Sequence, residues 1–292
     1  MSVRALSSSP AKSLKPMVAY CRERFPFPAV SILSLGTAIF LVAASSAQIE
    51  NNTFLLTALI AVTFLAFLLR QRVMDEFKDQ SHDDENYPNR PVQRGVITRK
   101  SLVYLGIFAF LLELSGVLSI WLISTQLISV LAYLAVLCFS GLTFYEFFAP
   151  TWLNKHFTLY FLTHQLIFVF FFLWGQSIFG FQEIQTAMPN GIAFMLVMAA
   201  LEVMRKYEIR TNAKNEIVMD TYLAVWGRNA SAVVLGLSFA LSGLLIQSLN
   251  LWQAVIGTSV GLGLYLSRDS QKIVQALTVL GFFALGLVAY FL

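Results

Sequence analysis

Long apolar segments, separated by polar ones, run along the chain from residue 29 to its end. Their lengths are close to the roughly 20 residues that an α-helix needs to cross the hydrocarbon core of a bilayer. The pattern predicts nine membrane-spanning helices, at residues 29–48, 53–72, 101–122, 125–147, 157–180, 190–208, 229–248, 250–267 and 271–292. The connections after the second and the sixth helix are long and charged, whereas the others are short.

The composition agrees with this pattern. Of the 292 residues, 57% are hydrophobic and 12% are charged, whereas soluble domains carry about 25% charged residues. We therefore expect an all-α, multi-pass membrane protein, with a cytoplasmic and partly disordered segment at 1–27 and one helical domain at 28–292. The polar first residues predict no secretory signal peptide. Cys21 and Cys138 have no metal-binding or redox spacing, so we expect both to be reduced.

The basic residues are unevenly divided between the two sides of the membrane that nine helices imply. All 20 Lys and Arg residues fall in the N-terminal segment or in the even-numbered connections, if the second connection is counted from Arg70. Because basic residues favour the cytoplasmic side, we expect the N-terminus and both long connections to be cytoplasmic, in a bacterial inner membrane. A miscounted helix would destroy this asymmetry, which supports the count of nine.

The second connection opens with an acidic run. Asp75, Asp79 and Asp83 are four residues apart, so a helix would place them on nearly one face. Carboxylates that close together repel one another and favour a bound cation, and carboxylate and phosphate oxygens are the usual ligands of Mg²⁺. Basic residues are interleaved with the acids, which suits a diphosphate ligand. The alternative is a solvated loop whose charges only keep it in water.

The same run resembles the first motif of the UbiA superfamily of intramembrane prenyltransferases, N-D-x-x-D-x-x-x-D followed by R-P-x-x-x-G. Here the first part reads Asp75-Glu76-x-x-Asp79-x-x-x-Asp83, and the second part reads Arg90-Pro91-Val-Gln-Arg94-Gly95. Asp75 stands where the family usually has Asn, and Glu76 stands where many members have Asp. The resemblance implies a nine-helix UbiA-type bundle with a central cavity open to the cytoplasmic rim, and Mg²⁺ as the cofactor.

The resemblance also implies roles for individual residues. The carboxylates that would hold Mg²⁺ are Asp75, Glu76, Asp79, Asp83 and Glu202, and all of them except Glu76 would be catalytic. The cations that would bind the diphosphate of the substrate are Arg72, Lys78, Arg90, Arg94, Lys155, Arg205 and Lys206. Lys155 is the one cation of the fourth connection, so an anchor that sets the orientation in the membrane is an equal alternative for it.

The second motif of the family, D-x-x-D or D-x-x-x-D at the end of the sixth helix, is only partly present. Glu202 can stand for its first carboxylate, but Arg205 or Lys206 occupies the position of the second. Glu208 would lie on the opposite face of a straight helix. The pattern therefore does not predict a complete second metal site. Arg205 and Lys206 either bind diphosphate directly or act as positive anchors at a helix end.

Two further residues are candidates for contact with an acceptor or a cavity. Glu113 lies in the middle of the third predicted helix, where a carboxylate is costly and marks a site or a partner. No basic residue is predicted at that depth, so we expect Glu113 to be protonated or hydrogen-bonded and to face the central cavity. His164 lies about two turns into the fifth helix and either contacts an acceptor or packs inside the bundle.

These observations predict an Mg²⁺-dependent intramembrane prenyltransferase. It would ionise a polyprenyl diphosphate and transfer the prenyl group to an aromatic or other lipophilic acceptor. A terpene cyclase of the same superfamily, which needs no external acceptor, is the alternative. A transporter or channel would carry charges deep in several helices, whereas only Glu113 is expected to be deep here. The expected partners are the two substrates and the lipid bilayer, with no nucleic acid; the acceptor, the chain length and the oligomeric state are not predicted.

Overall fold

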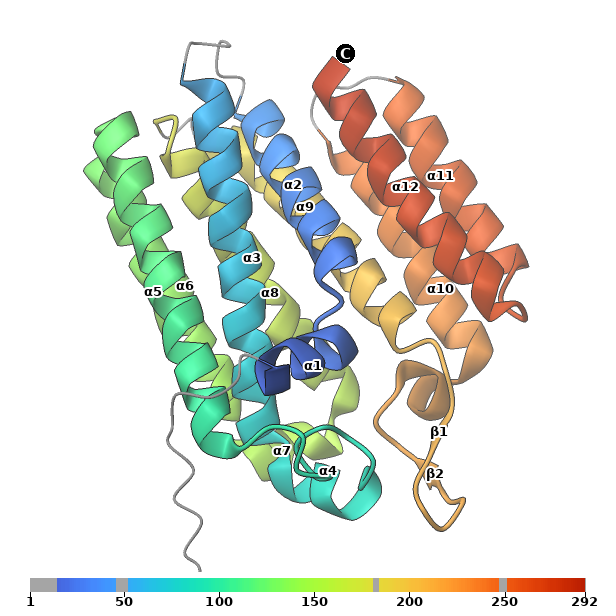
Figure 1. Ribbon diagram of the computed structural model, residues 1–292. Helices are drawn as coiled ribbons and strands as arrows, with labels where there is room; N and C mark the ends of the chain where they lie inside the picture. The colour runs from blue at the N-terminus through green and yellow to red at the C-terminus, as the bar shows by residue number, and fades with distance from the viewer. Residues whose placement is uncertain (1–14, 46–51, 181–183, 247–250, 292) are drawn as a thin grey trace, which may run out of the picture.

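The computed structural model describes residues 15–45, 52–180, 184–246 and 251–291 and is almost entirely helical (Figure 1). The long helices are α2 (Phe27–Ala44), α3 (Thr53–Lys78), α5 (Arg99–Ser124), α6 (Leu127–Phe144), α8 (Phe157–Ser177), α9 (Ile184–Arg205), α10 (Tyr222–Leu245), α11 (Leu251–Leu266) and α12 (Gln271–Phe291). The short elements are α1 (Lys15–Arg24), α4 (Gln80–Asn86), the 3₁₀ turn η1 (Glu146–Phe148), α7 (Pro150–Lys155), β1 (Arg210–Thr211) and β2 (Ile217–Val218).

The long helices form a closed ring. Each packs against the next along the chain, from α2 on α3 and α3 on α5 through to α11 on α12, and α12 returns to α2. Contacts of α2 with α8, of α3 with α6 and of α9 with α12 cross the inside of the ring. Many outward apolar side chains, such as Phe54 and Leu122, remain exposed, as expected for a surface that faces lipid.

The multi-pass, all-α architecture predicted from the sequence is confirmed. Within the described residues, a helix occupies each of the nine predicted places. Seven of them, α2, α3, α5, α6, α8, α9 and α10, are long and apolar enough to cross a membrane. The count of nine full spans is not confirmed, because α11 has 16 residues and the apolar part of α12 covers Gln271–Gly286.

One end of the ring gathers the polar elements. In Figure 1, α1, α4, α7 and the β1–β2 hairpin all lie at the lower end of the bundle. Helices α3 and α9 end there, and α5 and α10 begin there. The two long charged connections therefore lie on the same side of the bundle, as predicted. Residues 1–14, part of the N-terminal segment that we expected to be partly disordered, lie outside the described residues.

Aromatic side chains fill the inside of the ring between α3, α6 and α8. Phe64, Phe171 and Trp174 are fully buried, and Tyr133 is almost fully buried. The rings of Phe64 and Phe171 meet edge to face with centroids 4.7 Å apart, and those of Tyr133 and Trp174 do so at 4.9 Å, an arrangement that adds to the stabilisation from burial. The central cavity that we expected is not confirmed in this part of the bundle.

A buried ion pair corrects the expectation for Glu113. Arg70 donates two hydrogen bonds to the Glu113 carboxylate, at 2.6 and 2.9 Å, and Tyr133 donates a third at 2.5 Å. Glu113 is fully buried, so it has a cation at its own depth and does not face an open cavity. The expectation that Glu113 is hydrogen-bonded is confirmed, but the expected absence of a cation at its depth was wrong, because we assigned Arg70 to the charged connection although it lies inside α3. The pair joins α3 to α5 and α6.

Candidate active site

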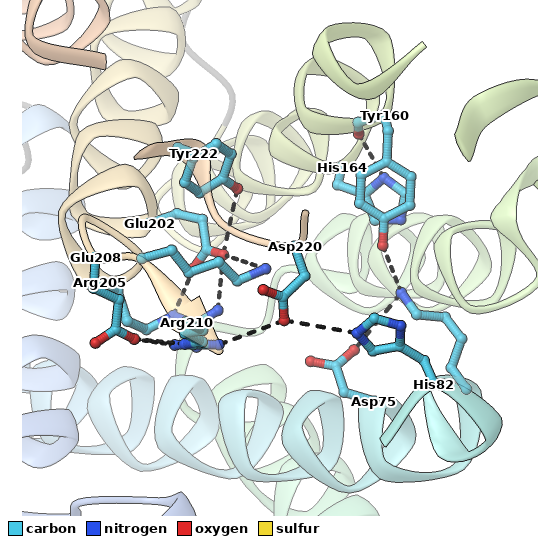
Figure 2. A network of polar contacts seen from close by, with 12 residues as sticks. Asp75, His82, Tyr160, His164, Glu202, Arg205, Glu208, Arg210, Asp220 and Tyr222 are labelled. Carbon is cyan, nitrogen blue, oxygen red and sulfur yellow. Dashed lines mark hydrogen bonds and ion pairs between the residues drawn. The ribbon is translucent and has the colours of Figure 1, made fainter. Parts of the chain in front are cut away.

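The last turn of α3 presents an accessible carboxylate beside a lysine. The side chain of Asp75 is 45% exposed, and its Oδ1 lies 3.9 Å from Lys78 Nζ. Lys78 also donates a hydrogen bond of 2.9 Å to the hydroxyl of Tyr160 on α8 (Figure 2). The longer α3 thus carries Asp75 and Lys78 on regular helix, and Tyr160 holds Lys78 against Asp75. Tyr160 had no predicted role. Its position in the first turn of α8 was the sequence feature that could have indicated a contact with this site.

A break in the helix at Asp79 separates the three aspartates that we expected on one stripe. Asp79 is the C-cap of α3 and the N-cap of α4, and its side chain is exposed. Crowding by the surrounding protein, followed by repulsion from Asp75, raises the pKa of Asp79 to about 6 even though the carboxylate stays accessible. Asp75 and Asp79 are therefore two accessible acids close enough to repel one another.

Asp83 has a different role from the one predicted. It is buried, with 3% of its side chain exposed, and it forms an ion pair with Arg90. The Arg90 guanidinium also stacks on the ring of Tyr87, 3.8 Å from its centroid. Asp83 and Arg90 therefore hold the loop after α4 in place. We correct their predicted roles as metal ligand and diphosphate ligand to this structural one.

Glu76 faces helix α1 and not Asp75. It is buried, and it pairs with Arg72 on its own helix and with Arg24 of α1 at 3.0 Å. The hydroxyl of the buried Tyr20 lies 3.3 Å from the same carboxylate oxygen. Both cations and the hydroxyl contact Oε1, whereas Oε2 is buried and has no hydrogen-bond partner among the described residues. Because Arg24 and Arg72 already neutralise this carboxylate, the structure favours a structural role for Glu76 and Arg72 over their predicted metal and diphosphate roles.

The loop that follows α4 is attached to α1 as well. Arg94 forms an ion pair with Glu23, and both side chains are more than two-fifths exposed. Gly95 has a φ of 75°, a conformation that glycine adopts without strain, and this turn brings the chain back toward α5. Arg94 thus lies on the outer side of the loop, with Glu23 as its partner.

The end of α9 lies opposite Asp75 in Figure 2 and neutralises its own carboxylate. Arg205 donates to both oxygens of Glu202, at 2.8 and 2.7 Å, and Lys206 Nζ lies 3.5 Å from one of them. The hydroxyl of Tyr222, at the start of α10, lies 3.4 Å from the same oxygen. Glu202, Arg205 and Lys206, the three residues predicted at this helix end, are therefore brought together. Their charges, however, are paired with one another in one ion cluster.

Asp220 connects the two long loops. It accepts a hydrogen bond of 2.7 Å from the hydroxyl of Tyr87, and His82 and Arg210 lie 3.7 and 3.8 Å from the same oxygen (Figure 2). Burial alone would raise the pKa of Asp220, but His82, Tyr87 and Arg210 together hold it below its usual value. The nearby carboxylate in turn raises the pKa of His82.

These contacts, and the small β1–β2 hairpin that carries Arg210, were not predicted. The hairpin pairs Arg210 with Val218 and Thr211 with Ile217, and Arg210 also pairs with Glu208 at 2.5 Å. Its turn includes Asn215 at a φ of 62°, a conformation that Asn tolerates better than most residues. The sequence signal was the pair Asn212 and Asn215 in the polar stretch before Ile217 and Val218.

Two predicted residues lie at the edge of this network. His164 hydrogen-bonds the backbone oxygen of Tyr160 at 2.7 Å, and its ring stacks on that of Tyr160, 4.0 Å between centroids. His164 therefore packs behind Tyr160, as Figure 2 also shows. Lys155, at the end of α7, is exposed and makes no ion pair within the described residues. The structure does not join it to the cluster.

The acidic groups fit a metal ion only in part. Within the described ranges, no group of three or more His, Cys, Asp or Glu side chains is placed to hold a metal ion. Mg²⁺ commonly uses only one or two carboxylates and takes its other ligands from water and substrate phosphates. Asp75 and Asp79 are accessible and repel one another, so they fit such a site, whereas Glu76, Asp83 and Glu202 are taken up by cations.

An apolar groove opens on the side of the bundle between α2, α9 and α12. Its lining includes Phe40 of α2, Phe194 and Val197 of α9 and Phe282 of α12. Gly36 on α2 allows this approach, because a Cβ there would lie 2.9 Å from the ring of Phe282. The groove is lateral, so an apolar chain could enter it from the bilayer.

Comparison with known proteins identifies the fold. No protein-family model and no curated protein sequence matches the chain. A solved structure of a digeranylgeranylglyceryl phosphate synthase is similar, with a TM-score of 0.53 and 12% sequence identity, and the match covers 96% of this chain and 100% of the other. At this identity the similarity shows a shared fold. It agrees with the all-α membrane fold that the resemblance to the UbiA superfamily implied, but the nine full spans and the central cavity are not confirmed.

Proposed function

We propose that this protein is an intramembrane prenyltransferase that transfers an isoprenoid group from its diphosphate to a lipophilic acceptor. The observation that carries the proposal is the accessible pair Asp75 and Asp79 at the polar end of a bundle with an apolar groove in its side. A polar ionic head and a long apolar tail are what such a site would accept. The shared fold with a membrane synthase of an isoprenoid lipid supports the same reading.

The acidic pair would bind the ionic head of the donor through Mg²⁺. Asp75 and Asp79 would supply one carboxylate each. When bound, Mg²⁺ would neutralise charge on the diphosphate and so favour cleavage of the allylic carbon–oxygen bond. Lys78 is held by Tyr160 beside Asp75, so its ammonium group would help to orient Asp75 toward the donor. We place this end of the bundle on the cytoplasmic side, because the long charged connections lie there.

The apolar part of the bundle would hold the isoprenoid chain. The lateral groove is lined by aliphatic and aromatic side chains from α2, α9 and α12. Aromatic faces can stabilise a developing allylic cation, and a dry surrounding prevents its capture by water. The acceptor would then attack the cation and lose a proton. An aromatic ring and another lipophilic nucleophile are both compatible with this site.

Prenyl transfer can be tested with protein purified in lipid nanodiscs. Wild-type protein, Mg²⁺ and allylic diphosphates of several chain lengths are incubated with and without aromatic and glyceryl phosphate acceptors, and both diphosphate release and prenylated product are measured. We expect release that depends on an acceptor. Release without an acceptor, together with a cyclic hydrocarbon, would instead indicate a cyclase, and no release under any condition would contradict both.

A residue-level control ties the activity to the acidic pair. Asp79→Asn is expected to abolish diphosphate release, because it removes one of the two accessible carboxylates. Asp269→Asn is the matched control, since Asp269 is a 70% exposed carboxylate paired with Arg228 outside the proposed site. Equal activity of the two variants would contradict the assignment of the site.

A further inference from the structure

The carboxylate at the end of α9 is already neutralised by two cations. Both oxygens of Glu202 accept from Arg205, and Lys206 lies 3.5 Å from one of them. A divalent ion at Glu202 would have to approach these two positive charges, which repel it strongly at these distances, and to compete with the bidentate Arg205. The residues of this helix end therefore do not fit a second metal site.

The same cations keep hydrogen-bond donors for another ligand. A guanidinium group has five N–H donors, of which Glu202 accepts two, and the Arg205 side chain is 53% exposed. Lys206 is 26% exposed, and its ammonium group lies 5.7 Å from the centroid of the Tyr222 ring. Since Glu202 fixes the plane of the guanidinium, the remaining donors are held in place before an anion binds, which lowers the entropy cost of binding.

The accessible acids lie across the site from these cations. In Figure 2, Asp75 lies across from Glu202 and Arg205 at the end of α9. No direct ion pair joins α9 to α3 in the described part of the chain. A ligand between them would therefore meet positive donors on one side and carboxylates that attract a metal ion on the other. A diphosphate fits this arrangement, because each of its phosphates carries negative charge.

We propose that the end of α9 is a metal-free diphosphate subsite. Arg205 and Lys206 bind phosphate oxygens directly, and Glu202 is a positioning residue that holds both cations. The proposal rests on the proposed function, since its ligand is the diphosphate group of the prenyl donor. It implies one divalent ion per chain, on the side of Asp75 and Asp79, in place of a second ion on Glu202.

The number of bound ions and the affinity for diphosphate test the subsite separately from catalysis. Mn²⁺ is counted by electron paramagnetic resonance on the full chain in nanodiscs with inorganic diphosphate, and diphosphate affinity is measured by calorimetry. We expect one Mn²⁺ ion per chain. Arg205→Gln and Lys206→Gln should each weaken diphosphate binding about tenfold or more, the scale of one charge-assisted hydrogen bond, without changing the number of Mn²⁺ ions.

Two further variants separate a positioning role from a structural one. Glu202→Gln should leave the Mn²⁺ count at one and weaken diphosphate binding, whereas Glu202→Asp should restore part of the affinity. Arg228→Gln is the matched control, because Arg228 is a 63% exposed arginine paired with Asp269, and it should bind diphosphate as the wild type does. Thermal unfolding of each variant identifies any that fails to fold, and Arg205→Lys then replaces Arg205→Gln.

A second Mn²⁺ ion in the wild type that disappears in Glu202→Gln would overturn the proposal, and so would unchanged diphosphate affinity in both Arg205→Gln and Lys206→Gln. If the wild type nevertheless transfers prenyl groups, the proposed function stands without the subsite. If one Mn²⁺ ion and Arg205-dependent diphosphate binding are found but no transfer, the subsite stands without the function. Repeating the titration with a non-hydrolysable isoprenoid thiodiphosphate distinguishes the donor from free diphosphate as the ligand.

Discussion

Helix α3 carries two charged residues, Arg70 and Asp75, that are five positions apart and differ in how closely their charge is paired. Arg70 and the Glu113 carboxylate are buried and joined by two hydrogen bonds, with a third from Tyr133. Asp75 is 45% exposed, and its nearest cation is 3.9 Å away. A buried ion pair contributes to stability only while both of its partners are present. An exposed carboxylate whose nearest cation is 3.9 Å away remains accessible to a ligand.

The largest effect is expected from breaking the buried pair. Glu113→Gln leaves the Arg70 guanidinium without a counter-ion inside the bundle, which costs about 3–5 kcal/mol in such pairs. We expect a clear fall in the thermal unfolding midpoint, measured by tryptophan fluorescence in detergent. Ser119→Ala is the control on the same helix, because Ser119 is exposed and bonds only a backbone oxygen of α5. Unchanged stability with lost acceptor binding would restore the acceptor role that the sequence suggested for Glu113.

Asp75→Asn should lower activity and leave stability nearly unchanged, the opposite of the result expected for Glu113→Gln. We expect prenyl transfer to fall on the order of 100-fold or more, the range seen when one group that stabilises transition-state charge is removed, with little change in the unfolding midpoint. Asp84→Asn provides the comparison, since Asp84 is 50% exposed and lies 3.9 Å from Arg99 but is not part of the proposed metal site. A large loss of stability in Asp75→Asn would mean that the two charged groups do not differ as described.

The raised pKa of Asp79 predicts how metal binding depends on pH. A proton and a metal ion compete for the carboxylate, and the Asp79 pKa of about 6 exceeds its ordinary value of 3.8. Mn²⁺ affinity should therefore be constant above pH 7 and fall by up to about tenfold per unit below pH 6. The weak Mn²⁺ binding that remains in Asp79→Asn should not show this change of affinity near pH 6. An inflection near pH 4 in the wild type would show that Asp79 is not perturbed.

Hydropathy and motif spacing were enough to predict the helical bundle and the accessible acids, but not the partners of those acids. Apolar segments placed the helices because the bilayer requires long apolar runs, and the spacing of the aspartates located the polar end. The end of α3 was misplaced by six residues, since charged residues inside a helix look like a connection in a hydropathy pattern. Arg70 was assigned to this connection, although the predicted helix already included it, and so it was not recognised as the partner of Glu113.

Glu76 and Glu202, each of which is paired with cations of its own, illustrate the same limit at the site. A sequence motif assigns a carboxylate by its position, but its charge is available only if no neighbouring cation reaches it first. For Glu76 one of those cations, Arg24, is 52 residues away in the chain, and for Glu202 both lie within one turn of the same helix. The first pair depends on tertiary structure. The second could be read from helical spacing, because residues three and four apart are neighbours on a helix.

Glu76→Gln tests whether the buried side of the acidic motif takes part in catalysis. The change removes the charge that Arg24 and Arg72 share, so α1 should dock less tightly, and cleavage by trypsin after Arg22 or Arg24 should become faster. We expect prenyl transfer to fall less than about fivefold, because a hydrogen bond at a site remote from the substrate is worth about 1 kcal/mol. A loss as large as that of Asp75→Asn would make Glu76 a metal ligand after all.

The smallest effect is expected where the two long loops meet. Tyr87→Phe removes the hydrogen bond to Asp220 of 2.7 Å, which corresponds to about 1 kcal/mol. His82 and Arg210 still lie within 4 Å of the same oxygen, so Asp220 is not left alone and the loops should stay together. Faster amide hydrogen exchange in the β1–β2 hairpin, with prenyl transfer reduced only a few-fold, would fit this account. Tyr104→Phe, at an exposed tyrosine on α5, should change neither. If hairpin exchange is unchanged in Tyr87→Phe, the two charged loops are held by the ion pairs alone, and the hydroxyl of Tyr87 contributes nothing to the site.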